Sequence, residues 1–100
     1  KIVFDAANLI DTADLRETTI KSVVSHALNV LGPDIVLTHA KELVADRSAV
    51  APGQGVLPWP WIVDALSAAG YDGTVVTHGL PVASVPAAVD TLAPLLAKAA

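Results

Sequence analysis

The sequence predicts an α/β protein in which parallel strands alternate with helices. Three short runs rich in β-branched residues stand apart along the chain, at residues 2–5, 35–39 and 74–78. Each run is apolar and ends at a polar residue, which is typical of strands buried on both faces of a parallel sheet. A segment with helical periodicity follows each run. This order fits parallel strands, which need a crossover connection that is usually a helix.

The first crossover segment has one apolar stripe along a helix. Asp14 and Glu17 have the spacing of a capping box at its start. Gly32, followed by proline, is expected to end it as a left-handed cap. The stripe consists of Ile20, Val23, Val24, Ala27, Leu28 and Leu31.

The second predicted strand, residues 35–39, leads into a long connection over 41–58. Its two glycines, in Pro-Gly-Gln-Gly, allow a tight turn, although a lone Gly-x-Gly is equally common in ordinary loops. A second helix is predicted from about Pro60 to Gly70.

The third predicted strand, residues 74–78, ends in Thr-His like the second. A last helix is predicted after Ser84, which is a suitable N-cap. Pro94 is expected to kink or divide this helix because proline removes a hydrogen bond and clashes with the preceding turn.

The polar ends of the three strands are Asp5, His39 and His78, which lie 34 and 39 residues apart. A (β/α)₈ barrel averages about 31 residues per βα unit, so the spacing suits three units of such a barrel. A small doubly wound sheet has the same order of elements and stays open as an alternative. In both architectures, chemistry lies at the carboxyl ends of the strands.

The composition excludes several classes of protein. Charged residues make up 16% of the 100 residues, and the net charge is −4, so no basic surface is expected for nucleic acid or an anionic membrane. No apolar run approaches the ~20 residues of a membrane span. Cysteine is absent, so a metal site must use His, Asp or Glu, and a cytoplasmic location is favoured. The start at Lys1 resembles an interior segment of a larger protein.

Asp5, His39 and His78 are the candidate metal ligands. Two imidazoles and a carboxylate suit Mn²⁺, Fe²⁺, Co²⁺ or Zn²⁺. Each residue alone is more typical of a structural role, such as a turn former or a hydrogen-bonded histidine, but their matching positions favour a shared site. Beyond the strand ends, the candidate substrate-binding residues are Asn8, Lys41 and Arg47, whose side chains can hold the oxygens of a polyol, carboxylate or phosphate.

Four stretches occur in an order that resembles a known family: IVFDAANLI, IVLTHAKEL, APGQGVLPW and AAGYDGTVVTHGL. The chain is similar to the C-terminal part of the sugar phosphate isomerase/epimerase family, the xylose isomerase-like TIM barrels. The resemblance covers nearly all of residues 1–100, as a single segment. It implies a TIM-barrel (β/α)₈ fold, of which this chain supplies about three parallel βα units.

The resemblance also implies a metal site. Family members hold a divalent metal with Glu, Asp, His and Glu, and Asp5 and His39 match the family Asp and His. His78 stands where the last Glu is expected, and Asn8 stands where the family often has a substrate-contacting His. The first Glu would lie upstream of Lys1. His78 is therefore expected to bind metal or to act as the catalytic acid or base.

The function expected from this resemblance is metal-dependent isomerisation or epimerisation of a sugar or sugar phosphate. The reaction would transfer a proton next to a carbonyl through an enediolate, with Mn²⁺, Co²⁺ or Zn²⁺ as cofactor. The alternatives are a dehydratase on the same fold and a non-catalytic, carbohydrate-binding relative that has lost the glutamates. The expected partner besides the substrate is a second copy of the chain or the rest of the barrel, because three parallel strands leave open edges.

Overall fold

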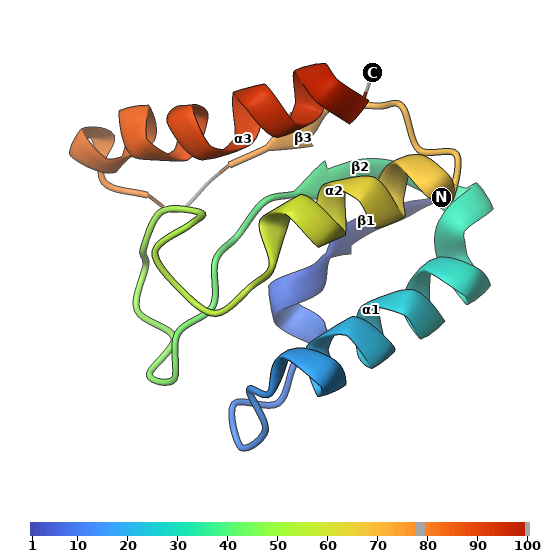
Figure 1. The fold of residues 1–100 in the computed structure, drawn as a ribbon, viewed down its shortest axis with the longest axis horizontal. Coiled ribbons are helices and arrows are strands. Elements are labelled where there is room, and N and C mark those ends of the chain that lie inside the picture. The colour runs from blue at the N-terminus through green and yellow to red at the C-terminus, as the bar shows by residue number, and fades with distance from the viewer. Residues whose placement is uncertain (78–79, 100) are drawn as a thin grey trace.

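The computed structural model describes residues 1–77 and 80–99, which form one three-stranded sheet with helices packed against it (Figure 1). The strands are β1 (Ile2–Asp5), β2 (Ile35–His39) and β3 (Val75–Val76). The helices are α1 (Glu17–Leu31), α2 (Trp59–Ala68) and α3 (Val85–Ala99). Short 3₁₀ turns lie between them: η1 (Ala6–Leu9), η2 (Gly32–Asp34) and η3 (Val82–Ser84).

The sheet is parallel and has the strand order β1-β2-β3. Its register pairs Phe4 with Thr38, and Asp5 with His39. The parallel strands that the apolar runs predict are therefore present, with two of the predicted polar ends side by side. The third strand is shorter than the predicted 74–78, and the predicted end at His78 lies outside the described residues.

The core lies between the sheet and the helices. Phe4 of β1 and Ile35 of β2 are buried in the same cluster as the apolar stripe of α1. The predicted stripe is confirmed, since Ile20, Val24 and Leu28 are buried and its other members pack against the cluster. Burying each large aliphatic side chain contributes roughly 1.5–3 kcal/mol. This packing holds β1 and β2 in the register that brings their ends together.

The start of α1 differs from the predicted capping box. The helix begins at Glu17, with Arg16 as the N-cap residue and no side-chain capping bond. The Asp14 carboxylate instead accepts hydrogen bonds from the Arg16 guanidinium, at 2.9 and 2.8 Å, and from the Thr19 hydroxyl at 3.0 Å. The hydrogen bonds from Arg16 come first among the causes that hold the pKa of Asp14 well below its usual range. The prediction failed because a local ion pair was available to Asp14.

The two helix-ending glycines behave differently. Gly32 has a φ of −46°, so the predicted left-handed cap is wrong, and the chain tightens there into η2. Gly70 has a φ of +87°. Beside it, the Tyr71 N–H donates to the Leu66 carbonyl and the Gly70 N–H to the Ser67 carbonyl, each at 3.0 Å. This pattern is a Schellman motif, in which glycine is favoured because it has no Cβ.

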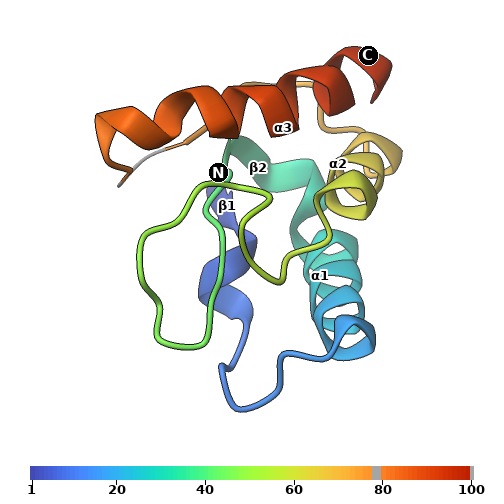
Figure 2. The ribbon, with the colours of Figure 1, turned by 60° about the vertical axis from the view of Figure 1, so that its left-hand side comes forward.

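The last helix, α3, contacts α2 and runs as one segment through Pro94 (Figure 2). Of the two effects expected of Pro94, a kink or a division, the division is therefore wrong. Proline has no N–H, so the carbonyl of Asp90, four residues earlier, has no donor within the helix. Pro94 and Asp90 are both exposed, so water can donate a hydrogen bond to this carbonyl instead. Over the described part of the chain, the helices fall short of the length and apolar character that a bilayer span requires.

Candidate functional site at the strand ends

Asp5 and His39 form the centre of the candidate site. They are paired in register at the carboxyl ends of β1 and β2. The Asp5 Oδ2 and His39 Nδ1 atoms are 3.8 Å apart, and the two side chains are 10% and 27% exposed. The second carboxylate oxygen, Asp5 Oδ1, is buried and has no hydrogen-bond partner among the described residues. Such an oxygen is costly unless a donor or a cation reaches it.

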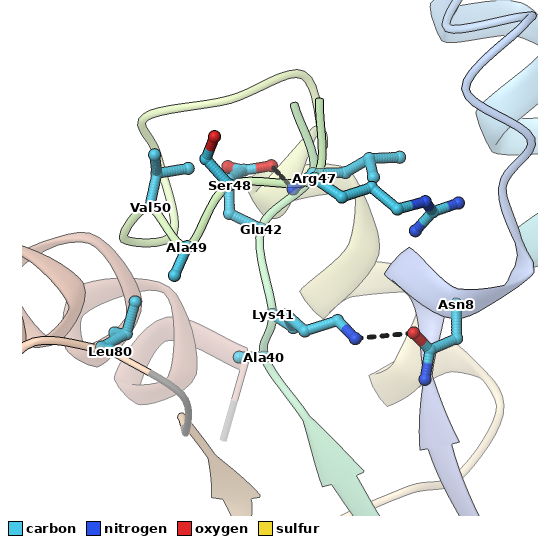
Figure 3. A pocket seen from close by; sticks show the side chains of 10 residues that line it. Asn8, Ala40, Lys41, Glu42, Arg47, Ser48, Ala49, Val50 and Leu80 are labelled. Carbon is cyan, nitrogen blue, oxygen red and sulfur yellow. Dashed lines mark hydrogen bonds between the residues drawn. The ribbon is translucent and has the colours of Figure 1, made fainter. Parts of the chain in front are cut away.

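Lys41 and Asn8 extend this site. The turn η1 follows β1 directly and brings Asn8 alongside the segment that leaves β2. The Lys41 ammonium donates a hydrogen bond to Asn8 Oδ1 at 2.6 Å (Figure 3) and lies 3.6 Å from Asp5 Oδ2. The Ala40 N–H donates to the Val76 carbonyl at 2.8 Å, which fixes the backbone before Lys41 against β3. Four residues predicted from the sequence are thus connected by ion pairs and a hydrogen bond: His39, Asp5, Lys41 and Asn8.

His78, the third predicted metal ligand and the predicted catalytic residue, lies outside the described residues. Within residues 1–77 and 80–99, no group of three or more His, Asp or Glu side chains is arranged to hold a metal ion. The described part of the candidate metal site is therefore the pair of Asp5 and His39.

A pocket of about 220 Å³ adjoins Lys41 (Figure 3). The loop after β2 forms most of its wall, and Leu80 closes it from the segment after β3. Two cations, Lys41 and Arg47, line it together with the amide of Asn8. Three of the predicted substrate-binding residues therefore share one pocket. It is lined by Asn8, Ala40, Lys41, Glu42, Leu43, Arg47, Ser48, Ala49, Val50 and Leu80.

Arg47 also holds the loop against η1. Its guanidinium donates to the Ala7 carbonyl at 3.5 Å and to the Ile10 carbonyl at 2.7 Å. Its backbone has a φ of +58°, a left-handed conformation that is uncommon for a residue with a Cβ. The neighbouring Ser48 donates hydrogen bonds to the Asp46 carboxylate, which lowers the pKa of Asp46. Arg47 therefore acts as a clamp between the pocket loop and the turn that carries Asn8.

Arg47→Ala is expected to lower the free energy of unfolding by about 2 kcal/mol, because two hydrogen bonds from a charged group are lost. Urea denaturation measures the change. The matched control is Arg16→Ala, since Arg16 is 76% exposed and solvent screens its ion pair with Asp14. An equal, small effect of both changes would show that the clamp does not contribute to stability.

Glu42 is the residue at this site that the sequence did not single out. Its side chain is buried, and the residue is 4% exposed. Oε2 accepts the N–H groups of Leu43 at 2.9 Å and Leu57 at 3.0 Å. Oε1 accepts the N–H of Gly53 at 2.9 Å and the indole N–H of Trp59 at 2.8 Å. The carboxylate therefore organises the whole loop between β2 and α2.

The sequence carries a weak signal for this role. Glu42 is followed by Leu43 and Val44, and an acidic residue beside an apolar pair at a strand end suggests burial with compensating donors. Three of its four donors lie 11 to 17 residues further along the chain, beyond the reach of local patterns.

The strand ends thus gather a carboxylate, an imidazole, an ammonium and an amide beside a small pocket. These groups can bind a cation and the oxygens of a polar small molecule. In comparisons with known proteins, no family model, curated protein or solved structure matches the chain.

Proposed function

We propose that the protein is a metal-dependent sugar or sugar-phosphate isomerase or epimerase, with Asp5, His39 and His78 as metal ligands. The observation that carries the proposal is the Asp5 carboxylate, which is nine-tenths buried and whose Oδ2 atom lies 3.8 Å from the His39 Nδ1 atom. A buried anionic oxygen of this kind is suited to a cation. In this proposal the three βα units belong to a xylose isomerase-like (β/α)₈ barrel, as the sequence resemblance implies.

The donor set fits a divalent ion. Carboxylate oxygen and imidazole nitrogen are ligands for Mn²⁺, Co²⁺ and Zn²⁺. Two ligand atoms that bind one ion at about 2.1 Å are separated by roughly 3.0–3.5 Å. The Asp5 Oδ2 and His39 Nδ1 atoms are 3.8 Å apart, so a small movement of either side chain is enough. A divalent ion bound there supplies a Lewis acid that polarises a carbonyl and the neighbouring hydroxyl.

The remaining residues bind and position the substrate. Lys41 and Asn8 carry an ammonium and an amide that can hold hydroxyl or phosphate oxygens at the pocket. Arg47 keeps the turn with Asn8 against the loop. In the alternative role expected for His78, Asp5 and His39 hold the ion and the unligated His78 imidazole transfers the proton beside the carbonyl, because it can both accept and return a proton.

Removing an imidazole ligand tests the proposal. His39→Ala is expected to weaken Mn²⁺ binding about 100-fold, because one of the proposed ligands of the ion is removed. Isothermal titration with Mn²⁺, together with metal analysis of the purified protein, measures the change. His26→Ala is the control, since His26 is exposed on α1 and takes no part in the site. Unchanged Mn²⁺ affinity in His39→Ala would reject the ligand assignment.

One observation favours a second candidate, a carbohydrate-binding protein without catalysis. The Lys41 ammonium lies 3.6 Å from Asp5, so the chain itself supplies a positive charge to the carboxylate. A metal-free protein of this kind would bind sugars in the presence of a chelator. It would not exchange the proton beside the sugar carbonyl with deuterium from the solvent. Metal-dependent deuterium exchange, followed by NMR across a panel of ketoses and ketose phosphates, separates the two candidates.

A further inference from the structure

We infer that Lys41 is a tethered cation that competes with a divalent ion for Asp5. Its ammonium is paired with the Asp5 carboxylate at 3.6 Å in the structure, and in this inference it moves away when the ion binds. This inference rests on the proposed function, because it concerns the same carboxylate. It assigns to Lys41 a control of metal affinity, besides the substrate contact proposed above.

The contacts of Asp5 indicate that Lys41 and a bound ion would share one carboxylate oxygen. The Lys41 ammonium and the His39 Nδ1 atom approach the same oxygen, Oδ2, at 3.6 and 3.8 Å. An ion held by Asp5 and His39 therefore comes within a few ångströms of a positive charge. Repulsion between like charges at this separation disfavours simultaneous binding, and it is weakly screened because the carboxylate is only 10% exposed.

The surroundings of Lys41 leave its side chain room to move away from Asp5. The side chain is 37% exposed and lines the 220 Å³ pocket, so its ammonium has space and solvent to move into. Its backbone follows Ala40, whose N–H is bonded to β3, so a rotation of the side chain is sufficient. The hydrogen bond that must be given up is the one to Asn8, an exposed residue. Lys41 is thus held by one hydrogen bond and one ion pair, and it has space to move into when an ion binds.

The chain offers a close control for this lysine. Lys21 on α1 is also 37% exposed, and its ammonium lies 3.8 Å from the Glu17 carboxylate. It is part of a surface ion pair away from the strand ends, and it also lies 5.7 Å from the centre of the Trp61 ring. Replacing either lysine with methionine removes one charge and keeps a flexible apolar side chain. The two variants therefore have the same net charge and differ in where the charge was lost.

The experiment measures Mn²⁺ affinity from the electron paramagnetic resonance signal of the free ion. Lys41→Met is expected to bind Mn²⁺ about tenfold more tightly than the wild type, because a neighbouring positive charge is removed. Lys21→Met is expected to stay within about twofold of the wild type. Lys41→Arg, which keeps the charge, is expected to bind no more tightly than the wild type. If Lys41→Met fails to fold, Lys41→Gln is measured, since its amide can still donate to Asn8 without carrying charge.

The outcomes separate this inference from the proposed function. Equal Mn²⁺ affinity in the wild type and Lys41→Met, with the affinity lost in His39→Ala, would overturn the competition and leave the metal site intact. If only Lys41→Met bound Mn²⁺, the result would support competition between Lys41 and the ion for Asp5 and would reject a metal-dependent function of the wild type. Binding by none of the proteins would overturn both. Equal tightening in Lys41→Met and Lys21→Met would also overturn the inference, because net charge alone would explain it.

Discussion

Replacing Glu42 with alanine is expected to lower the free energy of unfolding by about 4 kcal/mol, the largest effect predicted for this chain. The change removes the acceptor of three backbone N–H groups and of the Trp59 indole. Each buried donor left without a partner costs about 1–3 kcal/mol, and water entering the space left by the side chain recovers part of the sum. Urea denaturation followed by tryptophan fluorescence measures the change.

Two further variants make this result specific. Glu42→Gln keeps the shape but turns an amide NH₂ toward two of the N–H donors, so a loss of about 2 kcal/mol or more is expected. Glu17→Ala is the control, because Glu17 is exposed on α1 and its ion pair with Lys21 contributes less than about 1 kcal/mol. If Glu42→Ala were no more destabilising than Glu17→Ala, Glu42 would not be the organising centre of the loop.

The second large effect is expected from Gly55→Ala, which should lower the free energy of unfolding by about 3 kcal/mol. A Cβ at Gly55 would lie 2.4 Å from the Leu43 carbonyl oxygen and 2.6 Å from Glu42 Cγ. Neither atom can move freely, because the Leu43 carbonyl also accepts the Val56 N–H at 3.0 Å and the Glu42 carboxylate is held by its four donors. The backbone of the loop must therefore shift.

Gly32→Ala is the matched control for the change at Gly55. A Cβ there would meet Ala69 Cβ at 3.6 Å, an ordinary contact, and the φ of −46° suits alanine. We expect this variant to be as stable as the wild type or slightly more so, since alanine reduces the entropy of the unfolded chain. Thermal unfolding of both variants tests the comparison. A similar small effect in both would mean that the loop tolerates the added methyl group.

Most of the secondary structure could be predicted from the sequence. The apolar runs at β1 and β2 and the stripe of Ile20, Val24 and Leu28 on α1 are simple periodic signals, because burial on a sheet or a helix face repeats with a fixed period. The errors lie at the ends and interruptions of helices. Asp14 pairs with Arg16 instead of capping, and α3 continues through Pro94. These details depend on which partner a polar side chain finds nearby and on whether solvent reaches the backbone, and the periodicity of apolar residues reports neither.

The candidate site was only partly predictable. Asp5 and His39 could be placed together because each ends a strand of the same parallel sheet. Arg47 was expected only at the substrate, and the structure shows it bonded to the carbonyls of Ala7 and Ile10. The roles of metal ligand and acid or base for His78 stay predictions. Long-range contacts through a loop of this length have no periodic signature.

The alternation of strands and helices, and the shared end at which Asp5 and His39 lie, could be predicted because alternation and strand polarity follow from local patterns. The different roles of Lys41 and Glu42 follow instead from contacts between distant parts of the chain. The Lys41 side chain reaches Asn8, 33 residues away, through an exposed hydrogen bond. Glu42, the next residue, is buried and gathers donors up to 17 residues away. Adjacent residues that leave a strand can point in different directions, so the partners that folding brings to each one decide its role.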